Sequence, residues 1–148
     1  MSSGMRELRV WQEAVSLAGD VVRAARQGMK RETRSVSDAA MLTALAVATH
    51  IADGYARPTP PEQRDSYRSA KRALLRLETE LAVARHADLL PTGAFTDLAA
   101  RSALVAKLLT GYVAYLDRQI VDDAGRDPLT AGVADASRTT PGSARAPS

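Results

Sequence analysis

Three polar residues near the middle of the chain are the best candidates for acid–base chemistry. His50 and Asp53 are three positions apart, and Tyr55 follows two residues later. Residues three apart on a helix share one face, so an imidazole–carboxylate hydrogen bond can form there. Hydrolysis also needs a nucleophile and groups that stabilise an oxyanion, and the sequence shows neither. We therefore expect His50 and Asp53 to finish a helix and hold a turn.

The sequence contains no set of residues suited to binding a metal ion or to redox chemistry. The chain has no cysteine and two histidines, which excludes disulfides, thiolate metal sites and cysteine nucleophiles. The second histidine, His86, lies near the end of an expected helix, where the helix dipole stabilises a cation without any further role. Two distant histidines do not make a zinc site. The sequence predicts no metal, no cofactor and no enzymatic activity.

A second group of residues could bind a partner. Cationic residues recur at four-residue spacing at Arg64, Arg68, Arg72 and Arg76. Lys71 lies beside this series and Arg57 precedes it, and we call the six residues the arginine stripe. Guanidinium groups at this spacing can contact successive backbone phosphates without reading bases. Few aromatic residues interleave with the stripe, so base stacking is not indicated. A solvated face, or ion pairs to neighbouring chains and to Glu78 and Glu80, is the alternative interpretation.

Composition places these residues in one helical domain. The chain has 148 residues, of which 45% are hydrophobic and 4% aromatic, with a net charge of +3. This length and apolar fraction suit a single buried core, and the mildly basic balance permits nucleic-acid binding without requiring it. Residues 1–6 lack the apolar region of a signal peptide, and no apolar run has the length of a membrane span. We expect a soluble cytoplasmic protein without membrane contact.

Four segments have the apolar periodicity of helices. The first two seams are expected at Leu8, Trp11, Val15, Ala18, Val22 and Ala25, and at Met41, Leu45, Ala48, Ala52 and Tyr55. The third and fourth are expected at Tyr67, Ala70, Leu74, Leu77, Leu81 and Ala84, and at Phe95, Leu98, Ser102, Val105, Leu109, Tyr112 and Leu116. Short connections between such helices favour an antiparallel up-down four-helix bundle.

Capping residues mark the helix boundaries. Ser35 or Ser37 could cap the second helix, and Thr59 with its following prolines suits the start of the third. Gly54 is expected to end the second helix in the left-handed conformation, with Pro58 preventing its continuation. We predict a flexible segment over residues 1–5, the bundle over 6–121, and a disordered tail over 122–148, whose composition lacks an apolar face.

Apolar residues outside the expected seams suggest self-association. They are Val10, Leu17, Val21, Leu75 and Leu108. Together with the alanine-rich second helix, they leave more apolar surface than one small bundle should hide, and a large exposed apolar patch favours association.

Three sequence stretches resemble a known family when taken together. Leu8-Arg9-Val10-Trp11, Ile51-Ala52-Asp53-Gly54-Tyr55 and Leu77-Glu78-Thr79-Glu80-Leu81 resemble, in order and separation, bacterial four-helix-bundle proteins named for 23S rRNA intervening sequences. The resemblance marks Trp11, His50, Asp53, Gly54, Tyr55 and Glu78 as structural motif residues. It implies a homopentameric ring and a relation to accessory proteins of reverse transcriptases. His50 and Asp53 stand where the family usually has Asn and Glu.

The sequence as a whole therefore predicts a non-enzymatic, oligomeric, basic helical bundle. Binding of RNA, DNA or a nucleoprotein complex through the arginine stripe is the first functional hypothesis. A protein–protein scaffold or accessory subunit, without direct nucleic-acid contact, is the alternative, and a small helical enzyme is a distant third.

Overall fold

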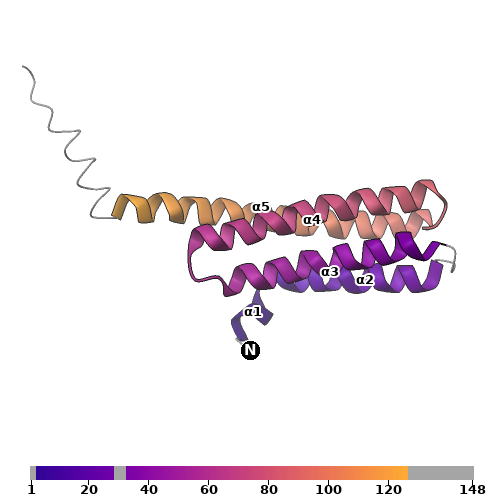
Figure 1. The fold of residues 1–148 in the computed structure, drawn as a ribbon, viewed down its shortest axis with the longest axis horizontal. Helices are drawn as coiled ribbons and strands as arrows, with labels where there is room; N and C mark the ends of the chain where they lie inside the picture. The colour runs from indigo at the N-terminus through magenta and orange to yellow at the C-terminus, as the bar shows by residue number, and fades with distance from the viewer. Residues whose placement is uncertain (1–2, 29–32, 127–148) are drawn as a thin grey trace, which may run out of the picture.

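The computed structural model describes residues 3–28 and 33–126, all of it helix or short connection. A short helix α1 (Ser3–Glu7) precedes four long helices: α2 (Arg9–Gly28), α3 (Arg34–Ala56), α4 (Pro60–His86) and α5 (Thr92–Arg126). The long helices run alternately up and down (Figure 1). The expected all-α antiparallel bundle is therefore confirmed for the single chain.

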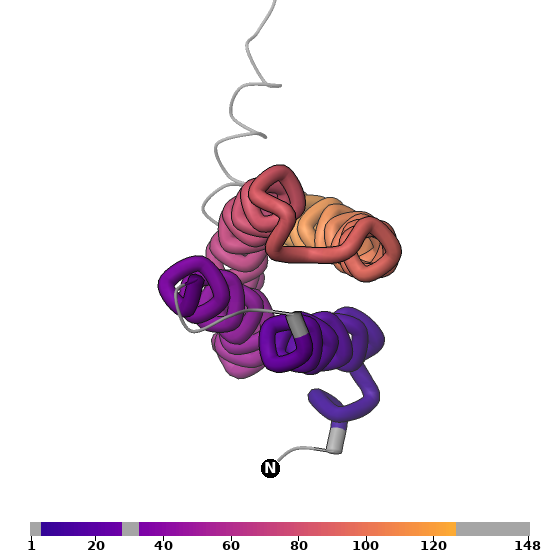
Figure 2. The backbone as a smooth tube through the Cα atoms, turned by 90° about the vertical axis from the view of Figure 1, so that its right-hand side faces the viewer, coloured from indigo at the N-terminus to yellow at the C-terminus, as the bar shows by residue number. Residues whose placement is uncertain are grey.

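Each long helix packs against its neighbours in chain order, and α5 closes the bundle against α2. Figure 2, viewed along the bundle, shows α4 and α5 on one side and α2 and α3 on the other. Since α3 lies between α2 and α4, it has neighbours on two sides.

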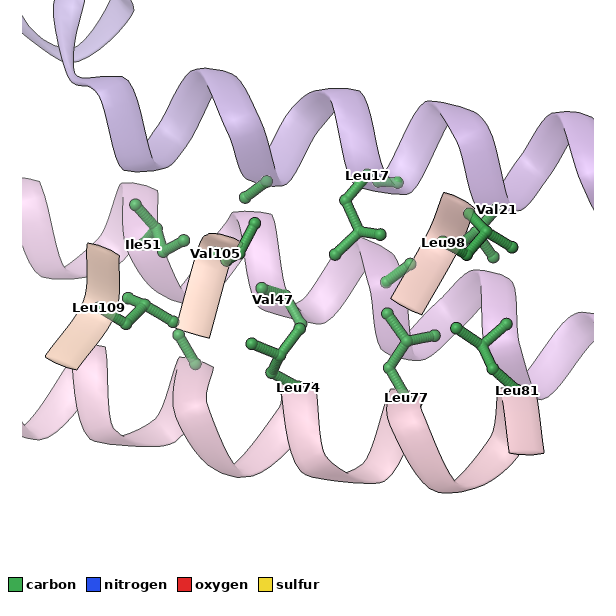
Figure 3. Close-up of a cluster of buried hydrophobic side chains, with 14 of the residues drawn as sticks. Leu17, Val21, Val47, Ile51, Leu74, Leu77, Leu81, Leu98, Val105 and Leu109 are labelled. Carbon is green, nitrogen blue, oxygen red and sulfur yellow. The ribbon is translucent and has the colours of Figure 1, made fainter. Parts of the chain in front are cut away.

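The core is a continuous column of aliphatic side chains along the bundle axis (Figure 3). The expected seam of α4 is buried throughout, from Tyr67 to Ala84. In α5 the seam residues from Leu98 to Leu116 are buried, apart from the half-buried Tyr112. The expected seam of α4 and most of that of α5 are therefore confirmed, with Phe95 at the start of α5 half-buried.

The seam predicted for α2 is right at Ala18 and Ala25, which are buried, but its other positions, and those predicted for α3, lie beside the residues that face the core. In α2 the fully buried side chains are Val10, Ala14 and Leu17, whereas Val15 is 42% exposed. In α3 the buried positions are Ser37, Ala40, Thr43, Ala44, Val47, Ile51 and Gly54. Small apolar residues surround both helices, so the sequence offers several equivalent seams and the packing of α4 and α5 selects one.

Three of the apolar residues that were expected to support self-association face the core instead. Val10, Leu17 and Val21 are buried in the core and add nothing to the outer surface. Leu75, from the same expected set, is 64% exposed. The other large exposed apolar residues are Val15, Leu42, Leu45, Tyr55, Val83, Tyr115 and Val121.

The connection between α3 and α4 departs from the expected glycine stop. No described glycine has a positive φ, and α3 continues past Gly54 to Ala56, with Arg57 extended at φ −68° and ψ 142°. Thr59 does cap α4, because its Oγ1 accepts a hydrogen bond from the Glu62 backbone N–H at 3.4 Å. At the start of α3, Thr33 occupies the cap position that we expected for Ser35 or Ser37, and it makes no side-chain cap hydrogen bond.

The connection between α4 and α5 begins with a left-handed residue. Asp88 has φ 60°, the Leu89 N–H donates to the Ala84 carbonyl at 2.8 Å, and the Asp88 N–H donates to the Arg85 carbonyl at 3.1 Å. This pair of bonds is the Schellman motif, which satisfies the last carbonyls of a helix. An aspartate occupies the position where glycine is the usual residue.

The ends of the described chain differ from the expected boundaries. Residues 3–5 belong to α1 rather than to a flexible segment, and residues 122–126 continue α5 rather than beginning a tail. The remainder of the expected tail, residues 127–148, lies outside the described residues, as do residues 1 and 2.

One described helix has the length and composition of a membrane span. The α3 helix reaches a mean hydropathy of 1.3 over an 18-residue window, so the expectation that no segment would do so is wrong. The helix packs between α2 and α4, and 39% of this window is buried within the bundle.

Candidate nucleic-acid interface

The first part of the arginine stripe leans from α4 toward α5. Arg64 Nη1 lies 3.2 Å from Asp117 Oδ1, and Arg68 Nη2 lies 3.9 Å from the same oxygen. The Arg64 side chain is only 25% exposed, against 46% for Arg68. Arg64 therefore ties α4 to α5, whereas Arg68 remains accessible at the edge of this pair.

The last residue of the stripe belongs to a polar cluster on the opposite edge of α4. Arg76 Nε lies 2.9 Å from Glu80 Oε1, and the Thr43 hydroxyl of α3 donates to the same oxygen at 2.8 Å. The Glu80 side chain is 15% exposed and Arg76 is 73% exposed. Glu80 thus joins α3 to α4, as the sequence anticipated in giving it an arginine partner.

The middle of the stripe is where positive charge is left uncompensated. Arg72 is exposed and donates to the neutral Ser69 hydroxyl at 2.9 Å. Lys71 is half-buried. Neither cation forms an ion pair with a carboxylate of the described residues, and Leu75, 64% exposed, lies one turn further along α4.

Arg57 does not continue this surface. Its guanidinium binds Asp53 Oδ2 from Nη2 at 3.1 Å and from Nε at 3.3 Å, and the Ser66 hydroxyl donates to the same oxygen at 2.9 Å. Hydrogen bonds from Arg57 and then from Ser66 lower the pKa of Asp53 below its ordinary value. This cluster fastens the end of α3 to the first turns of α4.

Gly54 lies at the closest approach of the same two helices. A Cβ placed on Gly54 would lie 3.0 Å from Tyr67 Cε1 and 3.1 Å from Ser66 Cβ. Glycine is therefore favoured here by the limited space rather than by backbone conformation. The Tyr67 ring is 4% exposed and tilts against Tyr112 of α5 at 5.9 Å between ring centroids. Burial raises the pKa of Tyr67 to about 12.

The other motif residues are placed around this joint and the core. Trp11 is half-buried against the core, Glu78 is half-buried on α4, and Tyr55 is 36% exposed. No hydrogen bond joins the described side chains of His50 and Asp53, and Asp53 Oδ2 instead accepts from Arg57 and Ser66. The structure therefore assembles a structural joint around Asp53.

His50 instead faces a shallow groove between α3 and α4. The groove encloses about 810 Å³, and its lining includes Thr43 on one side and Arg72 and Arg76 on the other. Over the described ranges 3–28 and 33–126, no three histidine, aspartate or glutamate side chains gather closely enough to hold a metal ion.

The sequence did not reveal the residues that bind some of the arginines, or the carboxylates beside them, and leave other arginines accessible. Asp117, Thr43 and Ser66 each come from a helix or turn distant in sequence from the cation or carboxylate they bind. Asp117 carried one available signal, since it follows Leu116 in the apolar seam of α5 and so lies beside the core.

The fold and this surface define a class of protein: a small four-helix bundle with a partly neutralised basic face on α4. Comparison with protein-family models matches residues 6–111 to the 23S rRNA-intervening sequence protein family. That match covers most of the chain, and the protein belongs to this family. A comparison with curated proteins finds no match.

Proposed function

We propose that this protein is a non-enzymatic, self-associating bundle that binds RNA, DNA or a nucleoprotein complex through the outward side of α4. The observation that supports the proposal most directly is the uncompensated charge of Lys71 and Arg72 beside the accessible Arg68. The family's description, which refers to an intervening sequence of 23S rRNA, is in keeping with a nucleic-acid partner.

Within this proposal the members of the stripe have different roles. Arg68, Lys71 and Arg72 contact phosphates, whereas Arg57 and Arg64 hold the bundle together through Asp53 and Asp117. The 3.9 Å contact of Arg68 with Asp117 is exposed, and exposed ion pairs contribute at most about 1 kcal/mol. A phosphate can therefore take the place of Asp117 on Arg68 at little cost.

The proposed assembly is a homopentameric ring in the cytoplasm. A ring repeats the α4 surface on each copy, so that weak contacts of single copies add to a useful avidity. The exposed apolar residues of α3, α4 and α5 support association of several copies. Light scattering should give a particle several-fold heavier than the 15.8 kDa chain, and a monomer at micromolar concentration would contradict the ring.

The binding test is a fluorescence titration of labelled RNA and labelled duplex DNA at several salt concentrations. Wild type should bind both without strong sequence preference and should bind more weakly as salt rises. The variant Arg68→Gln/Lys71→Gln/Arg72→Gln should lose affinity equally on all sequences. Each lost phosphate contact should flatten the slope of log affinity against log salt by about one.

A matched control separates the surface from overall charge. Arg6, Arg26 and Arg34 are exposed, lie on other helices, and make no ion pair with a described residue. Replacing these three by glutamine lowers the net charge equally and should leave most of the affinity. Equal losses in both triple variants, or no binding by wild type at low salt, would remove the stripe as a nucleic-acid site.

The exposed leucines favour a second candidate function. Leu42 of α3 is 68% exposed and Leu75 of α4 is 64% exposed, and both lie outside the core. A protein–protein scaffold, for example an accessory subunit of a reverse transcriptase, would use such residues with the arginines for protein contact. In that case Leu42→Gln/Leu75→Gln would abolish partner capture, and the triple glutamine variant would show no nucleic-acid defect.

A further inference from the structure

The surface between α5 and the first turn of α2 contains an apolar groove with a basic rim. The groove encloses about 550 Å³. Its cations are Arg9 of α2 and Lys107 of α5. The rest of its lining comes from α5: Leu104, Leu108, Gly111, Tyr112 and Tyr115. Gly111 leaves a gap in the floor, because a Cβ there would meet nothing within 4 Å. Tyr115 is 49% exposed.

The end of α5 has the complementary character. The last buried residue of α5 is Leu116, and Figure 1 shows the helix continuing past the start of α4. Val121 on this projecting end is 70% exposed. Asp122 and Asp123 follow it, both exposed and neither paired with a cation of the described residues. We call residues 120–126 the α5 tip.

We infer that the α5 tip of one copy docks into the α2/α5 groove of a second copy. Ile120 and Val121 fill the apolar groove over Gly111, and Asp122 and Asp123 pair with Arg9 and Lys107 at its rim. Both the apolar surface and the charges match, and such complementarity sets which surfaces of two partners meet. Burial of Val121 and Tyr115 removes two of the larger exposed apolar side chains from water.

The geometry of α5 requires the partner to be another chain. Gly111 and Val121 lie on one continuous helix, and ten residues at 1.5 Å each separate them by about 15 Å along a rigid axis. The tip therefore cannot reach the groove of its own chain. Each copy offers one tip and one groove, so copies join head to tail, and a closing rotation produces a ring.

This inference rests on the self-association in the proposed function and names the contact that would produce it. Two variants test it. In the tip variant, Asp122→Lys/Asp123→Lys, the acidic charges are reversed at a helix C-terminus, where cations favour the helix. In the groove variant, Gly111→Trp, a large side chain fills the gap that α5 leaves open.

Sedimentation velocity should show the assembled species for wild type and a predominantly monomeric chain for each variant, with assembly weakened at least about tenfold. An equimolar mixture of the two variants should form a one-to-one heterodimer, because the tip-reversed copy retains a groove and the groove-blocked copy retains a tip. Circular dichroism should show wild-type helicity in both. The control Asp38→Lys/Asp97→Lys reverses two exposed carboxylates outside the groove lining and should assemble normally.

The outcomes separate this contact from the broader proposal. Wild-type assembly by both variants would overturn the tip-and-groove contact and leave self-association standing. A monomeric mixture of the two variants would also overturn it. A monomeric wild type would remove both the contact and the ring, while nucleic-acid binding by Arg68, Lys71 and Arg72 would still be measurable on the single chain.

Discussion

Replacement of Gly54 by alanine tests how tightly α3 and α4 meet. In an ordinary helix interior this change is favourable, because glycine is about 1 kcal/mol less stable than alanine there. At Gly54 the added methyl would lie 3.0 Å from Tyr67 Cε1, 3.2 Å from Tyr67 Cδ1 and 3.1 Å from Ser66 Cβ. These contacts are shorter than ordinary van der Waals separations, so a neighbour must move.

The neighbours of Gly54 have little freedom to move. The Tyr67 ring is 4% exposed and rests against Tyr112, while Ser66 Cβ is fixed to the α4 backbone. Adding a methyl group to such a packed site costs about 1–3 kcal/mol. Subtracting the gain of about 1 kcal/mol in helix propensity leaves a net loss of about 1 kcal/mol in the free energy of unfolding.

Gly19→Ala is the matched control. Gly19 lies in the middle of α2, and a Cβ there meets nothing within 4 Å. This substitution should raise the free energy of unfolding by about 0.5–1 kcal/mol. Urea unfolding followed by circular dichroism measures both variants, at one fixed protein concentration because self-association alters apparent stability. The two alanine substitutions should therefore have opposite signs.

Combining Gly54→Ala with Tyr67→Leu tests whether the contact with the Tyr67 ring causes the loss of stability. Tyr67→Leu removes the ring atoms nearest to Gly54, so Gly54→Ala should cost less on that background, with a coupling of about 1 kcal/mol. If Gly54→Ala stabilises the protein as Gly19→Ala does, or if its cost is the same without the Tyr67 ring, the close approach does not explain the glycine.

Two further predictions concern Asp88 and Tyr67. Asp88→Gly should raise the free energy of unfolding by about 0.5–1 kcal/mol, because φ 60° costs glycine little; an unchanged urea midpoint would argue against strain there. Tyr67 has a pKa raised to about 12 in the folded protein, above its ordinary value near 10. The unfolded chain therefore releases this proton first, and stability falls as pH rises from 10 to 12. Tyr67→Phe should lose less stability than wild type over that interval, and an equally steep loss would contradict this reasoning.

The helices could be predicted from the sequence, but their facing sides only in part. In α4, Leu74 and Leu77 stand among charged residues, so one seam is available and the structure uses it. In α2, Val10 and Val15 both lie on plausible seams, and only contact with the neighbouring helices buries the first and exposes the second. The spacing of apolar residues identifies a helix in the sequence. Which side of that helix faces the core depends on neighbouring helices that are distant in sequence.

The candidate site shows the same limit. A spacing of four residues predicts that the arginines of α4 share one face of the helix, but it cannot show which of them already form ion pairs. Arg64 and Arg68 are four residues apart on one helix, and both approach Asp117. The Arg64 side chain is nevertheless only 25% exposed, whereas the Arg68 side chain is 46% exposed. The position of Asp117, fifty-three residues from Arg64 along the chain, decides this difference.

The motif that marks the family accounts for the fold and leaves little for a ligand. Ile51 is fully buried, the space beside Gly54 is occupied by Tyr67, and Asp53 Oδ2 accepts from Arg57 and Ser66. Side chains committed to the joint between α3 and α4 are not free to recognise a partner as well. The proposed binding function therefore uses residues other than Ile51, Asp53 and Gly54, and α4 around Arg72 and α5 around Val121 offer accessible charge and apolar surface for it.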